Sequence, residues 1–81
     1  MAISKEQIRA GRALVGLTAG DLAEKTGLGL STIQRMENRG TGSSTMANVE
    51  AVQAALEKEG VIFLPADQNI DGGAGVRLRK D

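Results

Sequence analysis

The sequence predicts a single, mainly helical domain, in which a compact bundle of about four helices is followed by a short C-terminal β-hairpin. Two observations support this fold class. Apolar residues recur at three- and four-residue steps over residues 1–60, and the pattern changes to short β-prone runs over residues 61–81. A chain of 81 residues can bury one hydrophobic core, so we expect the tail to share a domain with the helices.

Capping boxes mark the first two helices, which the sequence predicts over 5–15 and 19–26. In each box a Ser or Thr cap is followed three residues later by Gln or Asp, and a glycine stands just past the last turn. The pairs are Ser4 with Gln7 and Thr18 with Asp21, and the glycines are Gly16 and Gly27. The apolar side of the first helix contains Ile8, Gly11, Arg12, Leu14 and Val15.

Two further helices are predicted, one from 30 to about 38 and one from about 45 to 58. Ile33 and Met36 are spaced for burial in the third helix. The predicted buried side of the fourth helix consists of Met46, Val49, Val52, Ala55 and Leu56. Residues 39–44, between these helices, have no periodicity and the composition of a loop.

The tail has the pattern of a β-hairpin. Residues 61–64 are β-prone, residues 65–75 are rich in turn residues, and residues 76–79 alternate apolar with basic side chains. Because 61–64 is apolar on both faces, we expect one face or the open edge of the hairpin to contact a second copy. Arg77 and Arg79 would then point away from Val76 and Leu78.

Composition argues against most catalysis. The chain contains neither cysteine nor histidine, which excludes disulfides, thiol nucleophiles, the usual zinc ligands and histidine acid–base chemistry. We therefore expect no enzyme activity, metal site, cofactor or small-molecule ligand. The sequence also lacks an apolar run of 18 residues and an apolar leader, so we expect a cytoplasmic protein that does not bind membranes.

The charges are unevenly placed, although ten basic and ten acidic residues give a formal net charge of zero. Residues 1–43 carry a net charge of +2, residues 44–75 a net charge of −4, and residues 76–81 a net charge of +2. An anionic partner should therefore meet the N-terminal half of the chain.

Residues 22–37 have the spacing of a helix-turn-helix. In this motif a short glycine-containing turn joins two helices, and the second helix can lie in the major groove of DNA. Ala23 provides a small side chain where the two helices approach each other. An αα-hairpin with no DNA role has the same spacing and remains the alternative.

The residues of this segment also carry a family resemblance. The run Leu-Ala-Glu-Lys-Thr-Gly-Leu-Gly-Leu-Ser-Thr-Ile-Gln-Arg-Met-Glu-Asn, over 22–38, resembles the helix-turn-helix of the Xre/Cro family of phage-repressor-like regulators. The resemblance covers residues 4–58 and implies a compact bundle of four or five helices that binds double-stranded DNA. The chain departs from the family at Gly29, where a Ser or Thr cap is usual, and at Ala19, where Gln is frequent. The predicted hairpin replaces the family's fifth helix.

The resemblance implies a set of contacts for the third helix. It implies that Leu30, Ser31 and Arg35 contact DNA bases. It also implies that Thr32, Gln34 and Asn38 lie nearer the DNA backbone. Chemistry alone also favours Arg35, whose guanidinium can bond guanine O6 and N7 together, and an exposed Leu30 could touch a thymine methyl. A solvated arginine and a leucine at the edge of the core are the alternatives. Candidates for phosphate contacts are Arg39, Lys25 and Lys5.

Two charged residues lie where apolar ones are expected. Arg12 is on the apolar side of the first helix, and Glu37 is on the apolar side of the third. We predict that they form an ion pair, which the resemblance also implies.

The sequence thus predicts a sequence-specific protein that binds double-stranded DNA and acts as a small transcriptional regulator and a homodimer. The rival class is an antitoxin-like or adaptor protein that acts mainly through protein–protein contacts. A net charge of zero favours the rival, and the polar and basic third helix favours DNA.

Overall fold

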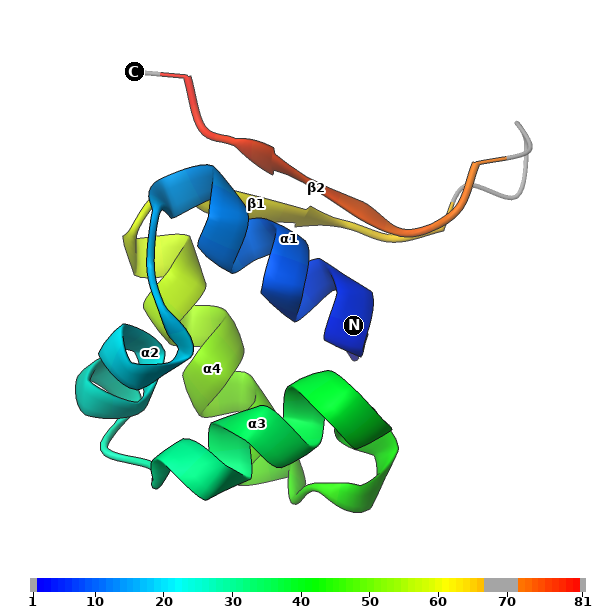
Figure 1. The fold of residues 1–81 in the computed structure, drawn as a ribbon. Helices are drawn as coiled ribbons and strands as arrows, with labels where there is room; N and C mark the ends of the chain where they lie inside the picture. The colour runs from blue at the N-terminus through cyan, green and yellow to red at the C-terminus, as the bar shows by residue number, and fades with distance from the viewer. Residues whose placement is uncertain (1, 67–71, 81) are drawn as a thin grey trace.

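The computed structural model describes residues 2–66 and 72–80, which form a compact helical bundle with a two-stranded antiparallel sheet (Figure 1). The predicted fold class is confirmed. The sheet lies along the helix Lys5–Val15, on the side of the molecule away from the helix Leu30–Arg39 (Figure 1). The elements are α1 (Lys5–Val15), α2 (Ala19–Thr26), α3 (Leu30–Arg39), the 3-10 helix η1 (Thr41–Ser43), α4 (Met46–Lys58), β1 (Val61–Leu64) and β2 (Gly75–Leu78).

The helix boundaries follow the predicted caps. Both capping boxes form, with each cap side chain and its partner exchanging hydrogen bonds with the backbone. The backbone and side-chain hydrogen bonds from Thr18 lower the pKa of Asp21 in the second box. Gly16 and Gly27 end α1 and α2 with φ of 70° and 74°, a left-handed conformation that glycine adopts without steric cost.

One hydrophobic core joins the helices to the sheet. Side chains of all four α-helices are fully buried in it, among them Ile8, Leu22, Ile33, Met36, Val52 and Leu56. Val61 and Phe63 of β1 belong to the same cluster, with 2% and 8% of their surfaces exposed. The tail therefore completes the core of the bundle.

The register of the sheet gives each strand one core-facing side. Val61 pairs with Leu78 and Phe63 with Val76, so these four side chains share the face that packs against the helices. Ile62 pairs with Arg77 on the opposite face. Arg77 thus points away from Val76, as predicted, but Leu78 at the end of β2 remains 51% exposed.

Three expectations about the helical region are wrong. Leu14 and Met46 are 42% and 77% exposed, although their spacing in the sequence predicts that both lie on buried helix sides. Leu14 lies in the last turn of α1 beside Leu78, where the sheet ends, and Met46 is the first residue of α4, beyond the covered part of that helix. The segment 39–44, expected to be a plain loop, contains η1, and the Thr41 hydroxyl donates to the Ile3 carbonyl at 2.7 Å.

A single buried amide fastens the sheet to α1. Gln7 is 3% exposed, and its Nε2 donates to the carbonyl oxygens of Leu64 at 3.1 Å and Gly75 at 2.9 Å. Its Oε1 accepts the backbone N–H of Ser4 at 2.9 Å, which closes the capping box. Gln7 therefore caps its own helix and also holds one end of each strand.

Gln7→Glu tests this role. A carboxylate would face two carbonyl oxygens, so we expect a loss of about 1–3 kcal/mol in the free energy of unfolding at neutral pH. Those oxygens should raise the pKa of the new carboxyl above its unfolded value of about 4.3, because only the protonated form can donate to them. The loss of stability should therefore be complete at pH values above the raised pKa of the folded state. It should shrink as the pH falls toward the pKa of the unfolded state.

Urea unfolding of the parent and the variant between pH 4 and pH 8 measures this effect. Gln34→Glu is the matched control, because Gln34 is exposed on α3 and its substitution should change stability little. A Gln7→Glu deficit that does not depend on pH would contradict the assigned hydrogen bonds.

Candidate nucleic-acid interface

The α3 helix has one buried and one exposed face. Ile33 and Met36 are fully buried, and Glu37 is 5% exposed. Six of the seven α3 residues predicted to contact DNA are exposed, and by helical spacing most of them share the face opposite the core. They are Leu30, Ser31, Gln34, Arg35, Asn38 and Arg39. Thr32, the seventh, is half-buried.

The turn before α3 is fixed by local contacts. The Thr26 hydroxyl donates to the Leu22 carbonyl at 2.8 Å and accepts the backbone N–H of Leu28 at 3.3 Å. Leu28 packs against the core, and Ala23, 8% exposed, belongs to that core. Gly29 at the start of α3 supplies no side-chain cap, so the first backbone N–H groups of this helix lack one.

The predicted ion pair between α1 and α3 is confirmed. The Nε and Nη2 atoms of Arg12 donate to the two carboxylate oxygens of Glu37 at 2.7 and 2.6 Å, and Nη1 donates to the Leu17 carbonyl at 3.0 Å. Hydrogen bonding to Glu37 raises the pKa of the Arg12 guanidinium above its ordinary value, so the guanidinium is charged at all ordinary pH values. A bidentate pair fixes the direction as well as the distance of the contact between two side chains. This pair therefore sets the orientation of α3 relative to α1.

Two of the three residues expected to contact phosphate, Lys25 and Lys5, are less favourably placed. The Lys25 ammonium lies 3.6 Å from the Glu59 carboxylate, which follows α4, so an acidic group already faces this charge. Lys5 is half-buried, whereas Arg39 at the end of α3 is exposed. Of the three candidates, Arg39 is the best placed for a phosphate.

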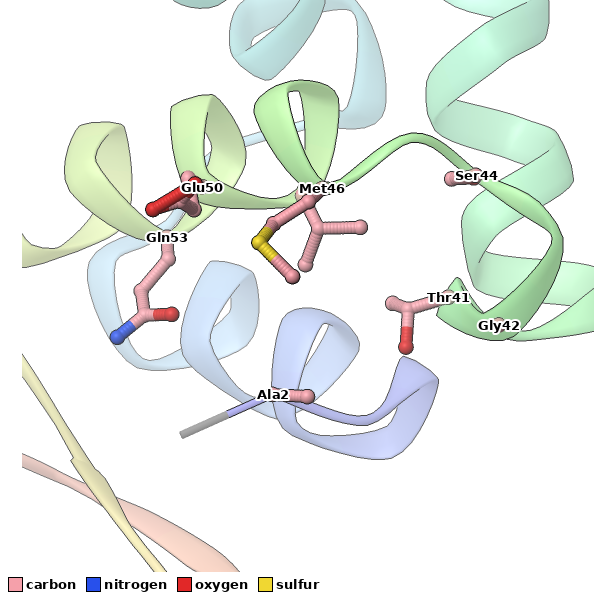
Figure 2. Close-up of a pocket in the computed structure, with 8 residues that line it drawn as sticks. Ala2, Thr41, Gly42, Ser44, Met46, Glu50 and Gln53 are labelled. Atoms are coloured by element: carbon pink, nitrogen blue, oxygen red, sulfur yellow. The ribbon is translucent and has the colours of Figure 1, made fainter.

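A groove of about 420 Å³ lies between the N-terminal segment, η1 and the start of α4 (Figure 2). Met46 lies over it, and Glu50 is its one charged lining residue within the described chain. The described residues contain no group of three or more side chains that could hold a metal ion. In the same part of the chain, no helix has the length and apolar character needed to cross a membrane.

The α2–turn–α3 unit and its exposed polar face define a helix-turn-helix module of the kind that binds DNA. A family model described as helix-turn-helix matches residues 8–62, more than half of the chain. The chain therefore belongs to the helix-turn-helix family of the Xre/Cro type, whose domains are DNA-binding and typically non-enzymatic. No curated protein matches it.

Glu37→Gln tests the ion pair. The substitution removes the negative charge but leaves the Arg12 guanidinium partly buried, so we expect a loss of about 3 kcal/mol in the free energy of unfolding. Chemical denaturation at pH 7 measures it, and Glu24→Gln, at an exposed position on α2, is the control. A midpoint equal to that of the parent would mean that the pair contributes nothing to stability.

Proposed function

We propose that the protein is a small cytoplasmic transcriptional regulator that binds a specific double-stranded DNA sequence as a homodimer, with α3 in the major groove. The observation that carries this proposal is the exposed face of α3, where Arg35 and Gln34 lie between Leu30 and Asn38. The membership of the chain in a DNA-binding family supports it.

Each residue of that face has a proposed role. Arg35 bonds guanine O6 and N7, Leu30 touches a thymine methyl, and Ser31 contacts a base edge. Thr32, Gln34 and Asn38 lie nearer the DNA backbone, and Arg39 contacts a phosphate. No cofactor takes part.

The zero net charge shapes the energetics of binding. Because the net charge is zero, non-specific attraction to DNA is weak and affinity falls modestly with salt. Base contacts then supply a large share of the discrimination between sequences. In a homodimer, two α3 helices enter successive major grooves about 34 Å apart, so the targets are palindromic.

An antitoxin-like or adaptor function is the second candidate. The zero net charge and the exposed Leu14 and Leu78 favour it, because both suit a protein-binding surface. Salt-dependent retention on heparin would favour the DNA function over the adaptor function.

Arg35→Ala tests the proposed base contact. Selection of bound fragments by the purified parent should first recover an enriched palindromic motif. On that site the variant should bind roughly 1–3 kcal/mol more weakly and lose preference at one base position. Lys58→Ala is the matched control, because Lys58 lies in the last turn of α4, next to the sheet and away from α3 (Figure 1).

The control should bind with the affinity and the base preferences of the parent. If selection with folded parent protein yields no enriched motif, the DNA function fails and the adaptor function takes its place.

A further inference from the structure

The β2 strand has a free edge. Within the described residues the sheet has two strands, and β2 pairs only with β1 (Figure 1). The Arg79 backbone N–H donates to the Gly60 carbonyl at 2.6 Å, and backbone groups alternate in direction along an antiparallel ladder. The backbone groups of Arg77 therefore point toward β1, and those of Val76 and Leu78 point outward. An outward row of this kind can accept another strand.

An apolar flank of α1 runs beside this edge. Gln7 donates to the Gly75 carbonyl at one end of β2, and Leu14 lines a hollow with Leu78 at the other end. The two pairs match in length, because seven helical steps and three strand steps both rise about 10 Å. Ala10 lies between Gln7 and Leu14 on the same side of the helix by helical spacing, and it is exposed. The α1 helix therefore runs alongside β2 over the whole length of the strand.

Ala10 lies on the outer side of this flank. The next residue, Gly11, faces β1, since a Cβ placed there would lie 3.4 Å from Val61. Ala10 is turned about 100° from Gly11 around the helix axis, away from β1 and toward the free edge. A strand added to β2 would set its inward side chains over Ala10 and beside Leu14 and Leu78, which are 42% and 51% exposed. These inward side chains should be apolar.

The other face of the sheet is basic along β2. Arg77 pairs with Ile62 on the face turned away from the helices, and Arg79 follows on that face two residues later. Both arginines are exposed, and no acidic side chain in the described part of the chain pairs with them. Side chains on one face of neighbouring strands lie close enough to interact, and opposite charges there are favourable. The outward side chains of an added strand should therefore be acidic.

We propose that this edge binds an extended segment of another protein in which apolar and acidic side chains alternate. The segment adds a third strand to the sheet, with its apolar side chains toward α1 and its carboxylates beside Arg77 and Arg79. Main-chain hydrogen bonds supply the affinity, and the two faces of the added strand supply the specificity.

A second copy of β2 fits this edge poorly. An antiparallel pairing centred on Arg77 sets the two Arg77 side chains opposite each other, and one centred on Leu78 sets Arg77 opposite Arg79. Like charges directly opposite are destabilising. A pairing centred on Val76 avoids this contact but moves the Leu14 and Leu78 pairs of the two copies apart. The proposed homodimer then forms through another surface.

The proposed partner and DNA occupy different sides of the molecule. The sheet lies away from α3, so a strand at the β2 edge leaves the exposed face of α3 uncovered (Figure 1). The protein can therefore hold DNA and a second protein at the same time. This inference goes beyond the proposed DNA function and does not depend on it.

Amide hydrogen exchange tests the strand addition, with a short capped peptide of alternating glutamate and valine as the probe. In the free protein the Val76 and Leu78 amides should exchange faster than the Arg77 amide, which points toward β1. At saturating peptide the exchange of the Val76 and Leu78 amides should slow more than about tenfold, while that of Arg77 changes little. The same peptide with lysine in place of glutamate should not protect them.

Substitution of the arginines tests the charge selection. Arg77→Glu should weaken binding of the glutamate peptide about fivefold or more, and adding Arg79→Glu should reverse the preference in favour of the lysine peptide. Arg9→Glu is the matched control, because Arg9 is exposed on the side of α1 turned away from Gln7. It makes the same change of charge and should bind both peptides as the parent does. Fluorescence anisotropy of the labelled peptides measures all three variants.

The outcomes separate the possible occupants of the edge. If the glutamate peptide fails to protect Val76 and Leu78, or if the parent binds the lysine peptide equally well, the inference is overturned. It also fails if both amides are already protected without peptide, and protection that grows with protein concentration would identify a second copy as the occupant. Selection of a DNA motif is independent of each of these results, so the proposed function is tested separately.

Discussion

The bidentate pair between Arg12 and Glu37 is the interaction on which the presentation of α3 depends. It joins the last turn of α1 to the last turn of α3, and a third hydrogen bond from Arg12 to Leu17 holds the connection to α2. The apolar contacts of Ile33 and Met36 are non-directional and would tolerate a small rotation of α3. The ion pair would not, because both of its hydrogen bonds require one orientation. The face that α3 shows to solvent is therefore set by a charged contact on its opposite side.

Local signals explain why much of the fold could be predicted. The capping boxes at Ser4 and Thr18 and the glycines after α1 and α2 act over three or four residues, so the helix limits follow from the sequence. The Arg12–Glu37 pair could be predicted as well, because each charge interrupts an apolar stripe. Six of the seven residues assigned to the DNA-binding face came from a family resemblance and Arg39 from its charge, and the structure leaves all of them except Thr32 exposed.

The features that could not be predicted depend on where distant elements end. The second role of Gln7 requires β1 and β2 to lie beside α1, and its capping position gives no sign of that. Leu14 has the spacing of a buried residue, but the sheet stops beside it. Periodicity places a side chain on a helix face and does not say how far the neighbouring element extends.

The hydrogen bonds of Gln7 have a consequence for how the chain acquires its structure. They join residues 57 and 68 positions apart, so the contact between α1 and the sheet is among the most distant in the sequence. During synthesis the last helix is complete at Lys58, when Val61 and Phe63 have not yet been added to the core. Gly75 follows later still. Contacts of such long range form late in folding. The helical part therefore reaches its full stability only after the chain has been synthesised through Gly75.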